Sequence, residues 1–393
     1  MIESTATSNI IQSLSENELL AGALNFCQKN AYGLAVWQLP SQDVINVFID
    51  DSEDFTLSDI PLENLSEGFI FAPFEKEGKR YFIKAKLKIN LEDKSIEGND
   101  SLREQLESHL DEYDFKQKSD KIDYTIESNP SDDFINLVNN SISHIKRGQF
   151  QKVVPSRFKK ITFKEGINPG SIFSNLTASY NTSFVSLVYT SETNLWIGAT
   201  PETLINTKDS KFTTVALAGT QKHNPEIDTS DIAWTQKEIE EQAFVSRYII
   251  NCFKKIRLRE FEELGPKTIQ AGNLIHLKTV YTVDMEATNF PQLGSVMLDL
   301  LHPTSAVCGM PLESAYNFIK ANEHYDRKFF SGYLGPVNSD GSTAIFVNLR
   351  CLELDGNQGT LYAGAGVTES SNPSKEWNET ELKMNTILNV LES

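Results

Sequence analysis

Two pairs of glutamates carry the clearest chemical signal in the 393-residue sequence. Glu238 and Glu241 lie in KEIEEQ, and Glu376 and Glu379 lie in KEWNET, each pair near the start of an expected helix. Residues three apart share a helix face, so each pair directs two carboxylates the same way. Two facing pairs would offer the oxygen ligands that Mg²⁺ prefers. For either pair alone, a solvated acidic first turn is the competing interpretation.

Lys152 and Glu202 are candidates for acid–base chemistry. Lys152, in FQKVVPSR, lies on an expected strand between apolar neighbours. Burial would lower its pKa and suit it to general-base work, but the nearby Pro155 is also typical of an edge strand, and the residues alone favour an outward lysine. Glu202 follows a proline at a turn in GATPETL. An apolar turn would raise its pKa and suit it to general-acid work, whereas a solvated turn glutamate is the ordinary alternative.

Arg350 and two glycines could receive an anionic ligand. Arg350 is expected in the middle of a strand in AIFVNLRCLEL, a run too apolar for a typical surface arginine. Its guanidinium could bind a carboxylate through two hydrogen bonds, or it could form an internal ion pair. Gly364 and Gly366, in YAGAGVT, permit close approach of a ligand to the backbone, or they mark a bulge or a packed strand crossing.

The elements expected to position these residues are both helical and extended. Helical spacing indicates helices near 131–145, 235–257, 292–301 and 312–322, and a last helix from Pro373 with Asn372 as its cap. Expected strands are Lys152–Val154, Ser183–Tyr189, Asn194–Gly198, Thr203–Asn206, Phe212–Ala218, Leu274–Met285, Gly332–Val337, Ala344–Leu354 and Thr360–Gly364. Strands in hairpin-like succession mixed with helices indicate an α+β fold. The sequence has no glycine-rich phosphate loop, so we expect no nucleotide cofactor.

Residues 1 to about 125 have a different character. They contain short apolar runs, followed by a charged stretch from Leu91 to Asp133 with one short expected helix around Leu102–Leu110. We therefore predict a variable N-terminal part, 1–125, packed on a continuous catalytic region, 126–393.

Composition excludes several classes of function. The net charge of −18 disfavours binding to nucleic acid or anionic lipid, both of which select basic surfaces. We expect neither a signal peptide nor a transmembrane helix, because the sequence has no basic leader followed by an apolar stretch and no apolar run of the required length. The four cysteines are widely spaced and form no CxxC motif, a pattern typical of reduced thiols in a cytoplasmic protein.

Nine segments, taken in order, resemble the chorismate-binding enzyme family, whose members include isochorismate, salicylate, anthranilate and aminodeoxychorismate synthases. They run from about Phe150 to Lys383: KVVPSR, GATPETL, ALAGT, KEIEEQ, HPTSAVCGMP, YDRKFFSGYLGPV, NLRC, YAGAGV and EWNETELK. The resemblance implies the family's fold, which is two packed, mainly antiparallel β-sheets surrounded by helices, with the active site between them.

The resemblance also implies roles for single residues. Mg²⁺ would hold the ring carboxylate of chorismate, with Glu241 and Glu379 as direct ligands and Glu238 and Glu376 acting through metal-bound water. Arg350 would bind the enolpyruvyl carboxylate, aided by the backbone at Gly364 and by Lys383. The ring would be surrounded by His302, Ala306 and Thr220. Phe330 would also contact the substrate, at a position where several relatives have tyrosine. Gln242 departs from the histidine of many members.

By the same resemblance, Lys152 would deprotonate a water that attacks C2, and Glu202 would protonate the departing C4 hydroxyl. Ammonia-using members typically lack the lysine, and Ala218 replaces the lysine found in aminodeoxychorismate synthases. We therefore predict an isomerase, an isochorismate synthase acting on chorismate without a glutaminase partner, whose product would serve menaquinone or siderophore biosynthesis. The alternatives are a salicylate synthase, an ammonia-using synthase component and a catalytically silent homologue.

Overall fold

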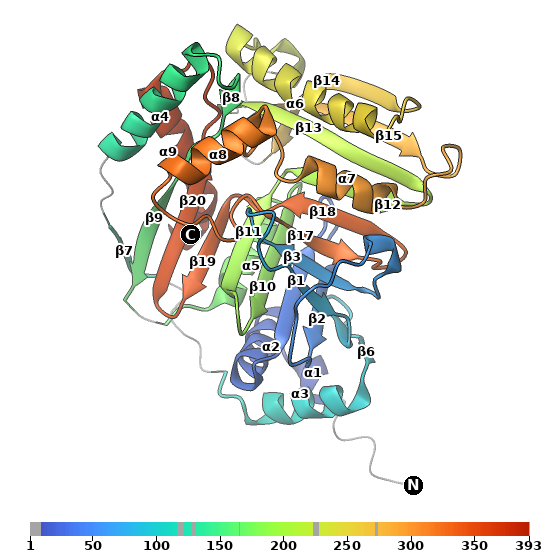
Figure 1. The fold of residues 1–393 in the computed structure, drawn as a ribbon. Helices are drawn as coiled ribbons and strands as arrows, with labels where there is room; N and C mark the ends of the chain where they lie inside the picture. The colour runs from blue at the N-terminus through green and yellow to red at the C-terminus, as the bar shows by residue number, and fades with distance from the viewer. Residues whose placement is uncertain are drawn as a thin grey trace.

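The computed structural model describes residues 9–115, 122–127, 131–164, 166–222, 228–271 and 274–392. Two large sheets dominate these ranges (Figure 1). The ten-stranded sheet has the order β6 (Ile96–Gly98), β5 (Leu87–Asn90), β2 (Ile45–Asp50), β1 (Gly33–Gln38), β10 (Phe184–Thr190), β11 (Asn194–Thr200), β19 (Cys351–Asp355), β20 (Gln358–Gly364), β9 (Ser156–Phe163) and β7 (Tyr124–Ile126).

The eight-stranded sheet has the order β14 (Glu262–Ala271), β15 (Leu274–Asp284), β13 (Lys211–Lys222), β12 (Thr203–Lys208), β18 (Thr343–Val347), β17 (Tyr333–Val337), β3 (Gly68–Ala72) and β4 (Tyr81–Lys84). Two short strands, β8 (Lys152–Val153) and β16 (Gly309–Met310), form a separate two-stranded sheet. The pairings within all three sheets are antiparallel, so the predicted α+β class with antiparallel sheets is confirmed.

Aromatic side chains fill the space between the two large sheets. Phe184 of the ten-stranded sheet stacks on Phe346 of the eight-stranded sheet, with ring centroids 4.0 Å apart. Strand β1 illustrates the layering: Ala35 and Trp37 belong to this aromatic layer, whereas Leu34 and Val36 face a helix-covered core on the other side. Because both faces of β1 are covered, its apolar residues run continuously instead of alternating with polar ones.

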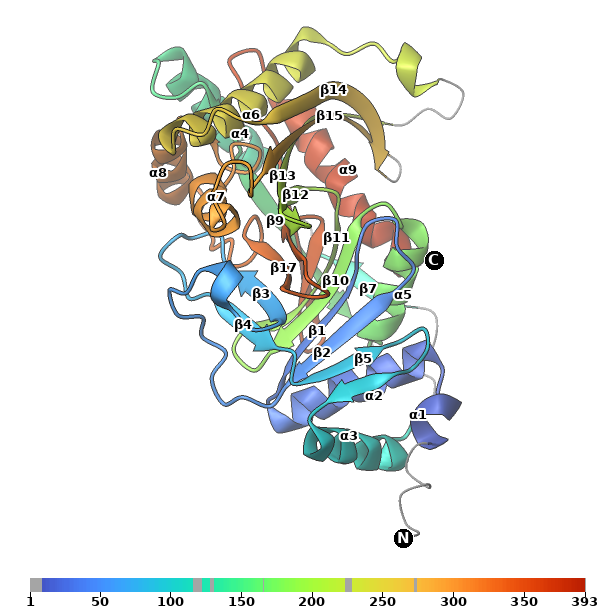
Figure 2. The ribbon, with the colours of Figure 1, turned by 90° about the vertical axis from the view of Figure 1, so that its right-hand side faces the viewer.

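Helices cover the outer faces of both sheets (Figures 1 and 2). The ten-stranded sheet packs against α1 (Asn9–Ser13), α2 (Glu16–Asn30), α3 (Asp100–Glu112), α5 (Pro169–Ser179) and α9 (Pro373–Glu392). The eight-stranded sheet packs against α6 (Gln236–Lys255) and α7 (Leu293–Leu301), while α4 (Ser131–Lys146) and α8 (Leu312–Asn322) pack around β8. Among the helices in these ranges, none has both the length and the apolar character needed to span a membrane.

The run Ala344–Leu354, predicted as one strand, is two strands in different sheets. β18 ends at Val347 and β19 begins at Cys351, so the chain crosses between the sheets at 348–350. The backbone of Asn348 is held by hydrogen bonds to Gly332 (2.9 Å) and Ser331 (2.7 Å), and Arg350 adopts a positive φ of 52°. The prediction of a single strand was wrong because an apolar run indicates burial but not a change of sheet.

The first third of the described chain contributes to both sheets. Residues 33–98 supply β1 to β6, and β1 and β2 lie inside the ten-stranded sheet. Within 91–133, the predicted short helix is confirmed as α3, and β6 and β7 are the two edge strands of the same sheet. The sequence analysis did not identify α2, α5 or β14.

Candidate active site

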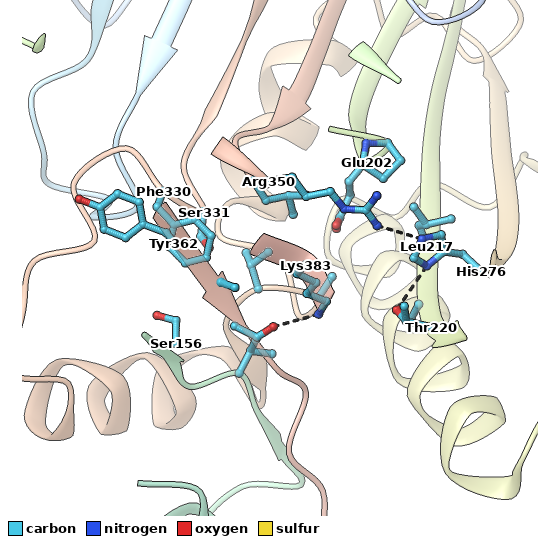
Figure 3. A pocket seen from close by; sticks show the side chains of 18 of the residues that line it. Ser156, Glu202, Leu217, Thr220, His276, Phe330, Ser331, Arg350, Tyr362 and Lys383 are labelled. Atoms are coloured by element: carbon cyan, nitrogen blue, oxygen red, sulfur yellow. Dashed lines mark hydrogen bonds between the residues drawn. The ribbon is translucent and has the colours of Figure 1, made fainter. Parts of the chain in front are cut away.

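A pocket enclosing about 720 Å³ of empty space, its open mouth included, lies where the chain crosses between the sheets. Its walls come from the β11–β12 turn, the end of β13, the start of β15, α6, the 348–350 crossing, the end of β20 and α9. Eight of the thirteen predicted site residues line it: Glu202, Thr220, Glu241, Ala306, Phe330, Arg350, Gly364 and Lys383 (Figure 3). The fold therefore brings together residues separated by up to 181 positions, from 202 to 383.

Arg350 is buried in this pocket and is held by a histidine. Its Nη2 lies 3.0 Å from Nε2 of His276, and Nδ1 of His276 lies 3.0 Å from the Gly219 carbonyl oxygen (Figure 3). Because an arginine can only donate, Nε2 accepts and Nδ1 carries the hydrogen. Burial, reinforced by Arg350, lowers the pKa of His276 to about 3, so the ring is neutral. His276 thus orients Arg350 without neutralising its charge.

Arg350 forms no ion pair with any carboxylate in the described ranges. Burial lowers the pKa of its guanidinium to about 10, opposed by Tyr180 and Glu202, but the group stays charged at neutral pH. A buried cation without an ion-pair partner is costly, and an anionic ligand would supply that partner.

Glu202 lies in the turn between β11 and β12, where its backbone nitrogen donates to Oγ1 of Thr200 (3.2 Å) and its carbonyl oxygen accepts from Val347 (2.9 Å). Burial raises the pKa of its carboxyl group to about 7, although Lys152, Lys383 and Arg350 all act to lower it. A carboxyl group with this pKa carries a proton near neutral pH and can donate it.

Lys152 is fully buried on β8, directly behind Glu241, and Nζ lies 3.2 Å from Glu241 Oε1. The outward orientation that the residues alone favoured is therefore wrong. Burial acts to raise the pKa of Glu241, but Lys152, Lys237 and Lys383 together keep it below its ordinary value. A Cβ on Gly366 would lie 2.4 Å from Glu241 Oε1 and 3.2 Å from Lys152 Cε, so only glycine leaves room for this pair.

The other three predicted metal-site glutamates also have partners. Glu376 is buried, and its Oε1 lies 2.7 Å from Nζ of Lys237; Glu379 lies 2.8 Å from Nζ of Lys383. Glu238 completes a capping box at the start of α6, where its Oε2 accepts from the backbone nitrogen of Thr235 (2.8 Å). Of the four glutamates, only Glu241 lines the pocket, and each of Glu241, Glu376 and Glu379 contacts a lysine.

The chemistry of these donors fits a hard divalent cation. All four are carboxylates, and Oε2 of buried Glu376 has no hydrogen-bond partner in the described part of the chain. Lysines, however, occupy the positions beside Glu241, Glu376 and Glu379. Within the described ranges, no three acidic, histidine or cysteine side chains converge closely enough to hold a metal ion. The Mg²⁺ site stays a prediction.

His302 lies outside this pocket, contrary to prediction. It caps the C-terminus of α7, where its backbone nitrogen bonds to the Leu298 carbonyl (3.0 Å), and its ring packs edge-on against Tyr333 with centroids 4.8 Å apart. It lines a separate cavity with Lys76 and Arg80, because the end of α7 directs its ring there. Its neighbours in the same motif, Ala306 and Val307, line the main pocket instead.

The sequence analysis missed several residues that shape the site. His276 orients Arg350, Lys237 pairs with Glu376, and Tyr362 stacks on Phe330 with centroids 5.4 Å apart. The only signal for His276 was a histidine inside the apolar run NLIHLKT. Gln242, noted as a departure from family histidine, donates to the Ala216 carbonyl (3.2 Å) and to Oγ1 of Thr279 (3.0 Å), so it ties α6 to the eight-stranded sheet.

A family model described as "Chorismate binding enzyme" matches residues 71–392, which is most of the chain. The chain belongs to the chorismate-binding enzyme family. The predicted family membership is confirmed, and the match begins at Phe71, inside the predicted N-terminal part.

Two proteins that this chain is similar to are isochorismate synthases. The chain is 30% identical to isochorismate synthase EntC of Escherichia coli over 247 residues, which is 62% of each protein. It is 28% identical to isochorismate synthase DhbC of Bacillus subtilis over 295 residues, covering 71% of this chain and 73% of that protein. The match to EntC thus spans less than two thirds of that relative's length.

Two solved structures share the fold at 20% sequence identity. A DhbC protein from Bacillus anthracis superimposes with a TM-score of 0.73 over 98% of this chain and 99% of that one. MenF, the menaquinone-specific isochorismate synthase from Escherichia coli, superimposes with a TM-score of 0.74 over 96% of this chain and 92% of that one. The predicted fold of two packed antiparallel sheets with surrounding helices is therefore confirmed across nearly the whole chain.

Proposed function

We propose that this chain is a Mg²⁺-dependent isochorismate synthase, which converts chorismate reversibly to isochorismate with water as nucleophile. The observation that carries the proposal is one pocket that holds a buried Arg350, which has no ion-pair partner among the described residues, together with a carboxyl group, Glu202, whose pKa is about 7. The names of the relatives support the same reaction.

The substrate is a dicarboxylate, and the pocket offers two fixed cations for its enolpyruvyl carboxylate. Arg350 would bind the enolpyruvyl carboxylate with its planar pair of donors, because His276 has already fixed its orientation. Lys383, whose Nζ donates to the Gly364 carbonyl (2.9 Å), would contribute on the same side. Two fixed cations in a water-poor pocket would hold the ring in one orientation, which lowers the barrier by positioning.

Mg²⁺, when bound, would supply a counter-charge for the ring carboxylate. Glu241 and Glu379 would be its direct ligands, with Glu238 and Glu376 acting through water. Each of the direct ligands contacts a lysine through its Oε1 oxygen in the structure, which leaves Oε2 as a ligand for the cation. Glu241 is the only ion-pair partner of Lys152 in the described chain.

Lys152 would then remove a proton from the water that attacks C2 of the ring. The two ring double bonds each move by one position, and the C4 hydroxyl leaves as water after taking a proton from Glu202. The reaction leaves Lys152 protonated and Glu202 ionised, and proton exchange with solvent restores both. The net change is an isomerisation. The raised pKa of Glu202 supports its role as the acid.

Water is favoured over ammonia because Lys152 is fully buried at the site and Ala218 lines the pocket. No glutaminase partner is then needed. We place the enzyme in the cytoplasm, where its four buried free thiols would stay reduced. Its product would serve menaquinone or siderophore biosynthesis.

The test is to incubate the purified protein with chorismate and MgCl₂ without ammonia and to separate the products by chromatography. An equilibrium mixture of chorismate and isochorismate, abolished by EDTA and restored by Mg²⁺, is the expected result. Salicylate with equal pyruvate would replace the proposal with a salicylate synthase. If product forms only when an ammonium salt is added, the chain is instead an ammonia-using synthase component. If no product forms under any condition, the chain is a catalytically silent homologue.

A further inference from the structure

A buried ion pair lies between α8 and β17, on one side of the active-site pocket. Nε of Arg327 donates to Glu323 Oε2 (2.7 Å) and Nη2 donates to Oε1 (2.5 Å). Both side chains are 3% exposed. The pair has the two-pronged geometry that a guanidinium forms with a carboxylate.

The remaining hydrogen bonds of this pair reach two other segments that line the pocket. Arg327 donates from Nη1 to the Val307 carbonyl (2.9 Å) and from Nη2 to the Val154 carbonyl (2.7 Å). Oε1 of Glu323 also accepts from the backbone nitrogen (2.7 Å) and from Oγ (3.0 Å) of Ser156. The ion pair therefore joins the segment that follows Lys152 to the segment that follows Ala306.

The strand that carries Lys152 is short, and its other contacts are backbone hydrogen bonds. β8 has two residues and pairs with the two-residue β16, in the register Lys152 with Met310 and Val153 with Gly309. Val153 also exchanges backbone hydrogen bonds with Val367 (2.8 and 3.1 Å), Val154 donates to the Cys308 carbonyl (2.8 Å), and Ala365 donates to the Pro155 carbonyl (3.1 Å). The Glu323–Arg327 pair adds side-chain hydrogen bonds to this backbone network, next to Ser156, where β9 of the ten-stranded sheet begins. Figure 3 shows Ser156 on the same side of the pocket as Phe330 and Ser331, away from His276 and Thr220.

Stability alone is a weak reason for such a pair. Burying two charges carries a large desolvation penalty, and well-packed apolar residues of similar volume are often as stable or more so. What an apolar pair cannot reproduce is the directional hydrogen bonds to Val154, Ser156 and Val307. The pair is therefore better explained by the need to hold those backbone groups in position than by a contribution to stability.

We propose that Glu323 and Arg327 are positioning residues that fix the base-bearing strand against the ring-facing Ala306–Val307 wall. This inference rests on the proposed function for its catalytic consequence, though not for its structural one. Loss of the pair would let β8 shift relative to the pocket. A misplacement of about 1 Å can lower a rate on the order of 100-fold, while binding of the substrate carboxylates by Arg350 and Lys383 would persist.

The decisive comparison is between Arg327→Met and the double variant Glu323→Leu/Arg327→Met. The single variant leaves a buried carboxylate without its partner, so both its Tm and its kcat should fall. The double variant removes both charges, so its Tm should recover while its kcat stays about 30- to 100-fold low and its KM stays within about threefold of wild type. Recovery of kcat together with Tm would overturn the proposal and leave a merely structural pair.

A matched control is available on α3, far from the pocket. Arg103 and Glu107 have the same four-residue spacing and a 2.9 Å contact, with the glutamate 4% and the arginine 40% exposed. Arg103→Met should lower Tm and leave kcat unchanged. A similar fall in kcat for this variant would show that loss of any such arginine–glutamate pair slows the enzyme, and would also overturn the proposal.

Amide hydrogen exchange separates this inference from the proposed reaction. In Arg327→Met, exchange should accelerate in 150–156 and 304–310 and stay unchanged in β19 and β20. Unchanged exchange in the first two segments would overturn the inference even if the wild type makes isochorismate. Accelerated exchange in a protein that makes no isochorismate would uphold the structural link and reject the proposed reaction.

Discussion

Nζ of Lys152 lies 3.2 Å from Oε1 of Glu241, and a Cβ on Gly366 would collide with that oxygen. The pair links a candidate base to a candidate metal ligand, so the charge on one controls the chemistry of the other.

Lys152→Ala should abolish turnover, lowering kcat by at least about 100-fold, because it removes the proposed general base beside Glu241. Chorismate binding, measured by calorimetry in the presence of Mg²⁺, should be largely retained. The control is Lys159→Ala, which removes a mostly buried lysine on β9 that pairs with Glu381. This variant should retain kcat. Wild-type turnover in Lys152→Ala would refute the assignment of the base.

Ionisation of Glu202 should make kcat fall at alkaline pH. The acid is active only when protonated, and the pKa of its carboxyl group is about 7, so kcat should fall as pH rises through that value. Glu202→Gln keeps the shape and removes the proton, so we expect a loss of at least about 100-fold in kcat at all pH values. A pH profile of kcat for both proteins checks this, and a wild-type rate that is flat from pH 6 to 9 would contradict it.

The same carboxyl group should also make the protein less stable as pH rises. Its folded-state pKa is raised from 4.5 to about 7, so its favourable contribution is full below pH 4.5 and is lost as pH rises through 7. The difference corresponds to on the order of 3 kcal/mol at 1.36 kcal/mol per pKa unit. Glu202→Gln should therefore raise Tm at pH 8 and change it little at pH 5. Equal changes in Tm at both pH values would show that ionisation of Glu202 has no such effect.

Arg350→Lys should raise KM about 10- to 100-fold, because an ammonium group cannot reproduce the paired donors that His276 orients. Steady-state kinetics give KM, and circular dichroism during heating checks that the fold survives. His276→Asn, which disturbs the same orientation from the other partner, should raise KM by less. An unchanged KM in Arg350→Lys would remove Arg350 from the carboxylate site.

Lys237 provides a test of the cation site that does not depend on turnover. It lies 2.7 Å from buried Glu376, so Lys237→Met leaves a charged carboxylate without its partner and should lower Tm without Mg²⁺. Millimolar Mg²⁺ should then raise the Tm of Lys237→Met more than that of wild type. Lys79→Met, which opens the exposed pair with Glu192, is the control and should not change the response to Mg²⁺. Identical Mg²⁺ responses in all three proteins would argue against a cation beside Glu376.

Glu379→Gln should make activity demand far more Mg²⁺, because it replaces a carboxylate expected to bind the ion directly with an amide. The measurement is the Mg²⁺ concentration that gives half-maximal rate, with Glu381→Gln on the same helix as the comparison, because Glu381 instead pairs with Arg157 and Lys159. The same Mg²⁺ requirement in wild type and Glu379→Gln would exclude Glu379 from the metal site.

Sequence patterns predicted the fold class and much of the site, but not the changes of direction. The amphipathic helix that carries Glu241 and the capped helix that carries Glu379 were predictable, because helical spacing and caps are local signals. The break between β18 and β19, just before Arg350, was not predictable, because it depends on backbone hydrogen bonds between Asn348 and residues 331–332. The direction of the His302 ring could also not be predicted from the sequence, since it depends on how the end of α7 packs against Tyr333.

Ion pairs between distant segments were the least predictable part of the site. Lys237 and Glu376 are 139 positions apart, and although Glu376 was predicted at the metal site, nothing in the sequence indicated that Lys237 would be its partner. His276 gave a weak signal because a buried strand histidine is as often structural as functional. These contacts arise only when α6, α9 and β15 have packed around one pocket.

The strand order of the ten-stranded sheet has a consequence for synthesis on the ribosome. β11 ends at residue 200, yet its neighbour β19 begins at residue 351, and β19 and β20 lie between β11 and β9. The middle of the sheet therefore stays open until almost the whole chain has emerged. Until residues 351–364 have emerged, β11 and β9 each present an unpaired edge, which exposes the nascent chain to aggregation and to chaperones.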